Sequence, residues 1–372
     1  MTKRLRLLLL AFGALTGLAL AAPALAAYTQ PYLAVQQSSY KVGAPTTVGV
    51  LVTAAPESSS GAPEDPTAKV TVFSPTGYGN NLSQAPGTTI GKAVAYVQSA
   101  SLGGLLGPLT GPVVVGNPAD PTLMAQSAKC TGSPTSQHVW VLNTTIQGQT
   151  IQIPAFVNVV GPYVVQQICL QSPADPANTF KAQLVLANYT LKGVFTNGSS
   201  RGEYQWAADF TPFVPGTVTP NPTATVEWRT YVGLPSSVTF KRARSKSSVV
   251  TFKGALHVEG LRPTGVRLHL YSATKAPPSP NFSLGTAAGL FGYGKFARTK
   301  AVKSNGKYTI TRKRPKGKKP TFFQMRFEDY LLSLQSGDNC DGPSPSGQAI
   351  PCNGETIAPL TSNMLRVAPR GR

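Results

Sequence analysis

The sequence offers few stretches in which a helix of about ten residues can run unbroken. Its 372 residues include 33 prolines and 36 glycines, which are spread along the whole chain. Both residues are unfavourable in a helix interior, so most candidate helices are interrupted. A mixed α/β enzyme requires helical segments of about 10 to 15 residues between its strands. The shortage of such segments weighs against that class of protein.

Apolar stretches long enough to cross a bilayer are also lacking beyond the beginning of the chain. The beginning has the three parts of a secretory signal peptide: a basic start, an apolar run from Leu7 to Leu20, and the small-x-small sequence Ala24-Leu25-Ala26. A retained membrane anchor is the alternative, but glycines interrupt the apolar run. No cysteine stands at the cleavage site, so a bacterial lipid anchor is not expected. We expect residues 1–26 to be removed and the mature chain to be secreted.

The chain has only four cysteines, Cys130, Cys169, Cys340 and Cys352, and no close C-x-x-C pair. The lack of a close C-x-x-C pair disfavours the alternative, a zinc site made of four cysteines. An even number of cysteines in an exported chain favours two disulfides. Three pairings are possible, and proximity in the sequence suggests Cys130 with Cys169 and Cys340 with Cys352.

What the sequence does contain is a series of short, β-branched or alternating runs between turn residues. Examples are TTVGVLVTA at 46–54, HVWVLNTT at 138–145 and TIQIPAFVNVV at 150–160. Regular short strands joined by turn-rich loops are typical of β-sandwiches. We therefore predict an all-β fold with two or three immunoglobulin-like β-sandwich domains after the signal peptide.

Charge divides the mature chain into two regions. Residues 28–232 contain eight basic and eight acidic residues, whereas residues 233–372 contain 23 basic and six acidic residues, a net charge of +17. The change begins in GLPSSVTFKRARSKSS, residues 233–248, whose composition is typical of a linker. We predict a neutral β-sandwich region at 27–235 and a strongly basic domain at 236–372. The neutral region forms one large sandwich or two smaller ones that meet near residues 117–125.

The basic region shows the strand pattern most clearly. Apolar and polar residues alternate in 250–259 and again in 266–271, and we expect these strands to form a hairpin with opposed His257 and His269. Two opposed histidines without a third ligand make only a weak metal site. The sequences GALHVEG, GVRLHLY, NGKYTI and FFQMRF resemble immunoglobulin-like or carboxypeptidase-regulatory-like modules of exported bacterial proteins. GVFTNGSSRGEYQWAADFTPFVPG, residues 193–216, is similar to secreted actinobacterial proteins. These resemblances imply fold and localisation and supply no catalytic residues.

A cluster of six basic residues in eight positions is the strongest functional signal. It consists of Arg312, Lys313, Arg314, Lys316, Lys318 and Lys319. We expect it to form the tip and flank of a β-hairpin and to bind an anionic cell-wall polymer or membrane surface. Aromatic residues are missing between these charges, which argues against a specific nucleic-acid partner. The alternative is that the charges keep the domain soluble and protect its edge strands.

A catalytic motif has weak support. Gly198-Ser199-Ser200-Arg201-Gly202 matches G-x-S-x-G, but a nucleophile elbow needs a helix after it, and EYQWAADF is predicted to be a strand. We predict no catalytic residue, cofactor, metal site or small-molecule substrate. The sequence favours a non-enzymatic exported protein that associates with the anionic envelope or extracellular polyanions. The alternative is a secreted hydrolase with its site in the N-terminal region.

Overall fold

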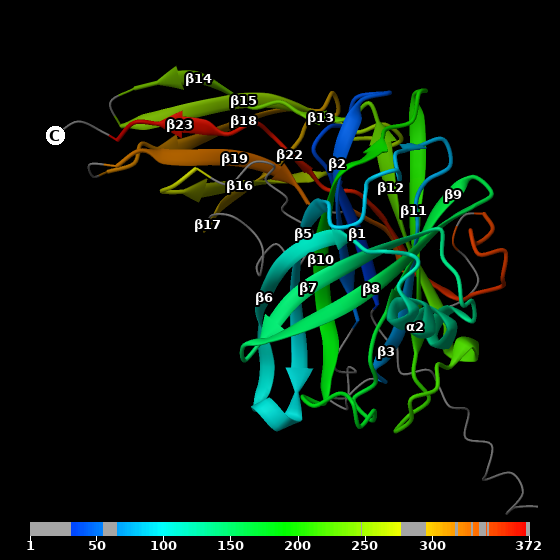
Figure 1. Cartoon of the computed structure of the whole chain (residues 1–372). Coiled ribbons are helices and arrows are strands. Elements are labelled where there is room, and N and C mark those ends of the chain that lie inside the picture. The colour runs from blue at the N-terminus through cyan, green and yellow to red at the C-terminus, as the bar shows by residue number, and fades with distance from the viewer. Residues whose placement is uncertain are drawn as a thin grey trace, which may run out of the picture.

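Figure 1 shows the fold as a computed structural model. The structure describes residues 31–54, 65–246, 248–276, 295–316, 319–328, 330–334, 340 and 342–369. The predicted signal peptide, residues 1–26, lies outside these ranges. Strands dominate the described residues, so the predicted all-β class is confirmed. None of the helices in the described part of the chain has the length and hydrophobicity to span a membrane.

Fourteen strands form one large sheet, which holds nearly all of the neutral region. Its order is β1-β2-β10-β5-β6-β7-β8-β9-β3-β11-β12-β21-β20, and β4 pairs with β10. The strands are β1 (Tyr32–Gln37), β2 (Pro45–Thr53), β3 (Thr67–Phe73), β4 (Gly79–Asn80), β5 (Thr89–Ser99), β6 (Gly104–Val115), β7 (His138–Ile146), β8 (Gln149–Val160), β9 (Tyr163–Cys169), β10 (Ala182–Thr196), β11 (Gly202–Pro212), β12 (Val226–Leu234), β20 (Tyr330–Leu334) and β21 (Cys352–Ile357). The 3-10 helices η1 (Ala100–Leu102) and η2 (Pro222–Ala224) lie in connections.

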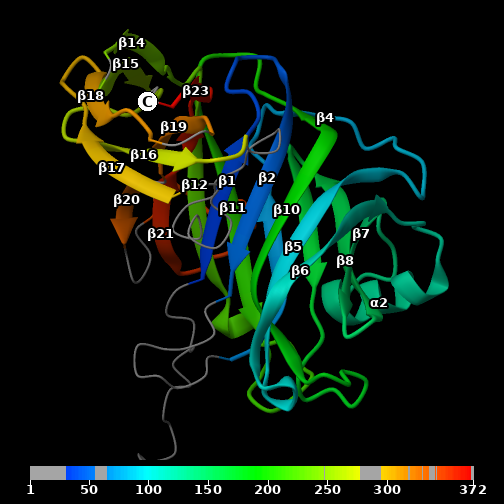
Figure 2. The same cartoon turned by 90° about the vertical axis from the view of Figure 1, so that its left-hand side faces the viewer.

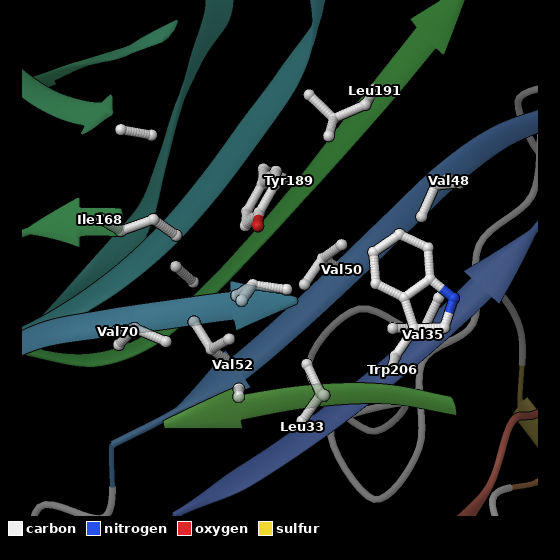
Figure 3. Close-up of a cluster of buried hydrophobic side chains, with 14 of the residues drawn as sticks. Leu33, Val35, Val48, Val50, Val52, Val70, Ile168, Tyr189, Leu191 and Trp206 are labelled. Carbon is white, nitrogen blue, oxygen red and sulfur yellow. The ribbon is translucent and has the colours of Figure 1, made fainter. Parts of the chain in front are cut away.

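The large sheet curves round so that β1 lies beside β12 (Figure 2). Tyr32 of β1 meets Trp228 of β12 edge to face, with ring centroids 5.1 Å apart. Alternate residues of the strands point into the enclosed space, because side chains along a strand alternate between its two faces. Figure 3 shows Val50, Tyr189 and Trp206 in this core, and all three are buried. Burial of these large apolar side chains is the main source of stability for the sheet.

Residues 117–132 connect β6 to β7 through α2 (Pro121–Thr131), which lies on the outside of the large sheet (Figure 1). The carboxylate of Asp120 accepts hydrogen bonds from the first turn of α2, and Gly132 ends the helix in the left-handed conformation. Cys130 in the last turn forms a disulfide with Cys169 at the end of β9. Strands on both sides of residues 117–125 pair within the same sheet.

The basic region folds into two further sheets that face each other. One contains β13, β15, β14 and β18, and the other contains β17, β16, β19, β22 and β23. Their bounds are β13 (Ser237–Val238), β14 (Lys241–Ser245), β15 (Val249–His257), β16 (Arg267–Ala273), β17 (Lys295–Ala301), β18 (Lys307–Lys313), β19 (Thr321–Phe327), β22 (Leu360–Thr361) and β23 (Leu365–Val367). Phe252, Leu268 and Met325 pack in a separate core between these sheets.

The strand pairs predicted for this region are wrong, although the strands themselves are present. β15 pairs with β14, β13 and β18, whereas β16 pairs with β17 and β19, so the expected 250–271 hairpin does not form. β18 and β19 also lie in different sheets. The described residues 314–316 and 319–320 therefore lie on a crossover between two sheets and not on the tip of a hairpin. The passage 233–248, predicted to be a linker, contains β13 and β14.

The end of the chain returns to the large sheet. β21 pairs in parallel with β12, and β20 pairs antiparallel with β21. The second predicted disulfide, Cys340–Cys352, closes the loop before β21. The Tyr40 hydroxyl also donates a hydrogen bond to the carbonyl of Pro359 at 2.6 Å. The basic sandwich is thus joined to the large sheet at more than one point of the chain.

Candidate functional site

The outer face of the β14–β15–β18 sheet gathers the basic residues of the C-terminal region. On β15, Val250 and Phe252 are completely buried, so Thr251 and Lys253 face the other way, toward solvent. On β18, Tyr308 and Ile310 are buried in the same core, so Thr309 between them points toward solvent. Figures 1 and 2 show this sheet at the outer end of the molecule, with no labelled element over its outer face.

Strand register arranges six outward residues in two rows across the three strands. The first row is Lys241, Lys253 and Thr309, and the second is Arg244, Thr251 and Thr311. We call these the two basic rows. Neighbouring strands lie about 4.8 Å apart, and successive same-face residues about 7 Å apart. The hydroxyls of Thr251 and Thr311 are 3.1 Å apart, which shows that they share a face.

The electrostatic character of this face is uniformly positive. Lys241, Arg244 and Lys253 are exposed, and in the described part of the chain no carboxylate forms an ion pair with them. Glu259 is the only acidic residue in the sequence from 228 to 327. Its carboxylate is already engaged, because it pairs with Arg201 at 2.8 Å. Among the residues that the structure describes, this face therefore has no internal counter-charge.

The structure describes five of the six predicted cations, and they differ in burial. Arg312 and Lys313 are the last residues of β18, where Arg312 is half-buried and Lys313 exposed. Arg314 is half-buried, and its guanidinium Nε donates a hydrogen bond to the carbonyl of Ala368 at 3.1 Å. Arg314 therefore fastens the C-terminal segment beside β18.

The remaining three predicted cations follow β18. Lys316 and Lys319 are exposed on the crossover, and Lys318 lies outside the described residues. Sequence reasoning missed Lys241 and Arg244 because the strand that carries them was assigned to a linker. The signal was present: KRARS has a basic residue at three of its first four positions and precedes a strongly alternating strand. Charged residues with a β-bulge between Arg242 and Arg244 are typical of an edge strand.

The two histidines of the basic region do not come together. His257 is on β15 and His269 on β16, in different sheets. The His257 Nε2 atom lies 3.6 Å from Glu259, and the His269 Nδ1 atom lies 3.0 Å from Glu328. The shared metal site considered from the sequence is therefore wrong. Within the described ranges, His, Cys, Asp and Glu form no group of three able to hold a metal ion.

The G-x-S-x-G motif lies in the loop before β11. Because β11 begins at Gly202, a strand follows the serine where a nucleophile elbow requires a helix. The Ser200 hydroxyl lies 3.1 Å from the Tyr204 hydroxyl, and Tyr204 also donates to the Ser200 carbonyl at 2.8 Å. These contacts give Ser200 a structural role in the turn before β11.

A second charged cluster is buried on the outer side of the large sheet. Glu227 and Arg229 on β12 form an ion pair and are almost fully buried. The disulfide-closed loop covers them: the Ser344 hydroxyl donates to Glu227, and Arg229 donates to the Gly342 carbonyl at 3.0 Å. Polar partners thus satisfy charges whose burial is otherwise costly.

Asp209 of β11 lies opposite Glu227 in the register. Burial, followed by repulsion from Glu227, raises the pKa of Asp209 from 3.8 to about 8. Burial also lowers the pKa of Lys69 on the neighbouring β3. Asp209 therefore holds a proton at neutral pH and avoids a second buried negative charge beside Glu227.

A small apolar cavity of about 10 Å³ lies in the core of the neutral region. Leu109, Leu142, Ile153 and Leu184 contribute to its apolar wall, and its lining contains no acidic, basic or imidazole side chain. The side chains that line the cavity therefore include no general acid or base that could serve in hydrolysis.

Comparisons with known proteins leave the family open. No family model and no curated protein sequence matches this chain. Among the solved structures that match is the modular three-domain backbone pilin of Streptococcus pyogenes, with 11% identity and a TM-score of 0.27. The match covers 90% of this chain and 52% of that pilin, so this chain spans about half the pilin's length.

Two further pilin structures also match. The pilus 2b backbone protein of group B streptococcus is 10% identical, with a TM-score of 0.25, and the match covers 89% of this chain and 97% of that one. Two domains of the major pilin SpaD from Corynebacterium diphtheriae are 11% identical, with a TM-score of 0.24 and coverage of 88% and 99%. TM-scores this low support no argument about fold or function.

Proposed function

We propose that this chain is an exported, non-enzymatic β-sandwich protein that attaches to anionic polymers of the cell envelope or to extracellular polyanions. The signal-peptide sequence supports export, and so do two disulfides that use all four cysteines. The basic C-terminal region is the attachment surface, and the large sheet has a structural or interaction role.

The observation that carries this proposal is the unpaired positive face. Lys241, Arg244 and Lys253 are exposed on one sheet, and Lys313, Lys316 and Lys319 are exposed near its end. Each basic residue close to an anionic surface contributes about 1 kcal/mol to binding. Six residues together therefore give several kcal/mol, enough for attachment at low ionic strength. Salt weakens such binding steeply because the polyanion regains its counterions.

The test measures binding of the full mature chain to isolated bacterial cell walls and to vesicles that contain anionic lipid, over a series of salt concentrations. The comparison is a combined variant in which Lys241, Arg244, Lys253 and the six basic residues at 312–319 are changed to Gln. We expect the wild-type chain to bind at low salt and to be released as salt rises, and the combined variant to bind at least a hundredfold more weakly. Wild-type chain that stays in solution with both would overturn the proposal.

A control separates loss of charge from loss of structure. Lys41, Lys92 and Lys192 belong to the neutral region, and their change to Gln removes charge without touching the basic face. We expect this control variant to bind within about twofold of the wild type. Far-ultraviolet circular dichroism of each variant verifies that the β-fold is intact.

A further inference from the structure

The two basic rows have the composition of a phosphate-binding surface. Resting on the proposed function, we infer that Lys241, Lys253 and Arg244, with the threonines beside them, bind successive phosphates of a linear phosphodiester polymer. The inference narrows the contact from the whole basic region to one sheet face. It also names phosphate as the anionic group that this face recognises.

The arrangement of side chains points to phosphate. Lysine, arginine and threonine hydroxyl groups are common donors to phosphate oxygens, and each row offers at least one cation and one hydroxyl. The hydroxyls of Thr251 and Thr311 are close enough to hydrogen-bond each other, so both are held at the surface beside Arg244. Neither row contains a carboxylate, which would repel the anion.

The pairing of Lys241 with Lys253 is unfavourable without an anion. Residues directly opposite each other in an antiparallel pair have Cβ atoms about 5 Å apart, and like charges at that distance destabilise the sheet. In the described structure no acidic side chain forms an ion pair with either lysine. A phosphate between the two ammonium groups would turn this repulsion into two attractive contacts.

The shape of the face favours a linear polymer over a membrane. Membrane-surface binding depends on buried apolar area as well as on charge, and neither row contains an aliphatic or aromatic side chain. Without aromatic side chains the rows also cannot stack on bases or sugars. The two rows lie about 7 Å apart along the strands, which gives two successive phosphates of an extended polymer neighbouring positions on this face.

The experiment compares two variants of the full mature chain that lose the same charge. The row variant carries Lys241→Gln, Arg244→Gln and Lys253→Gln. The crossover variant carries Lys316→Gln, Lys318→Gln and Lys319→Gln. Binding to synthetic poly(glycerol phosphate) is measured by calorimetry at low and at intermediate salt. We expect the dissociation constant to rise at least tenfold in the row variant and less than threefold in the crossover variant.

A hydroxyl variant tests recognition independently of charge. Thr251→Val with Thr311→Val keeps every cation, so a purely electrostatic surface predicts unchanged binding. We expect a threefold to tenfold loss for poly(glycerol phosphate) and less than a twofold loss for heparin, a sulfated polymer. Equal losses for the two polymers would overturn the assignment to phosphate.

The possible failures distinguish the inference from the proposed function. Equal losses in the row and crossover variants would overturn the inference and leave general polyanion attachment intact. Tighter binding to anionic vesicles than to the polymer would also overturn it, in favour of a membrane partner. Wild-type chain that binds neither polymer, vesicles nor cell walls would overturn both.

Discussion

The charged cluster on the large sheet and the basic rows on the C-terminal sandwich differ in their exposure to solvent. In the large sheet, Glu227 and Arg229 are buried as a pair beneath a disulfide-closed loop, and Asp209 keeps its proton beside them. In the basic sandwich, Lys241 and Lys253 lie opposite each other in water. Burial makes a charge dependent on its fixed partner, whereas exposure leaves it free for a partner that arrives from solution.

The difference also shows why net charge alone is a poor guide to function. The neutral region has equal numbers of acidic and basic residues, but some of these charges, such as Glu227 and Arg229, are buried and paired with each other. The basic region has 23 basic and only six acidic residues, so most of its positive charge stays at the surface, although Arg326 is buried over the ring of Tyr271.

Removal of one member of the buried pair should have the largest effect. Arg229→Met leaves the Glu227 carboxylate buried without its cation, and we expect the free energy of unfolding to fall by about 3 to 5 kcal/mol. The matched change on the exposed face, Lys253→Met, should alter it by less than about 0.5 kcal/mol. Urea titrations of both variants measure the difference. If both variants lost only a small and similar amount of unfolding free energy, the buried pair would not differ energetically from the exposed lysine.

Disulfide removal should come next. Cys130 and Cys169 are 39 residues apart, and Cys340 and Cys352 are 12 apart. In the loop-entropy picture, changing both cysteines of a pair to Ser costs about 4 kcal/mol for the longer loop and about 3 kcal/mol for the shorter one. Loss of the shorter bridge should also expose the Glu227–Arg229 pair, so its measured cost should exceed the entropic value. Urea denaturation of the two double variants would contradict this if the shorter bridge cost less than about 2 kcal/mol.

The buried Asp209 should give the large sheet a pH dependence. Its folded pKa is raised, so between about pH 4 and pH 8 the folded state holds a proton that the unfolded chain has released. Stability is therefore greatest below pH 4 for this group and falls as the pH rises, by at most about 1.4 kcal/mol per pH unit. Asp209→Asn should flatten that fall.

Thermal unfolding from pH 4 to pH 9 measures this slope. Glu203→Gln on the same strand is the control, because Glu203 is exposed, and it should leave the slope unchanged. A slope identical in wild type and Asp209→Asn would show that Asp209 titrates at its ordinary pKa.

The smallest effect is expected at Ser200. Ser200→Ala loses the contact between the two hydroxyls of Ser200 and Tyr204 but leaves the turn intact, so stability should change by about 0.5 kcal/mol or less. An ester-hydrolysis screen should show no difference between the variant and the wild type. Activity present in the wild type and lost in Ser200→Ala would restore the hydrolase alternative.

The sequence predicts which face of a strand is buried better than which strand lies beside it. Alternation placed Val250, Phe252, Tyr308 and Ile310 inward, as the structure has them. Alternation carries no information about partners, because a period of two is the same in every neighbour. In the sequence, the segment between β18 and β19 therefore had the appearance of a hairpin tip. Proximity in the sequence predicted both disulfide pairings correctly, because each bridge links cysteines that are neighbours in the order of the chain.

The candidate surface was only partly predictable for the same reason. The run at 312–319 is visible as composition, and Lys313, Lys316 and Lys319 are exposed as expected for a binding segment. Lys241 and Arg244 join the surface through pairing of β14 with β15, some 70 residues earlier in the chain than β18. Only three-dimensional structure brings these residues into one row. The burial of Glu227 likewise depends on a loop more than 100 residues later.

The parallel pairing of β21 with β12 has a consequence for the order of assembly. Twelve of the fourteen strands of the large sheet are synthesised before the basic sandwich, yet β12 has no hydrogen-bonded partner on that side until residues 352–357 have been added. A growing or truncated chain therefore presents an uncovered strand edge, a hazard for sticking to other chains. Most strands of the basic sandwich, from β13 to β19, are therefore synthesised before this edge of β12 is covered.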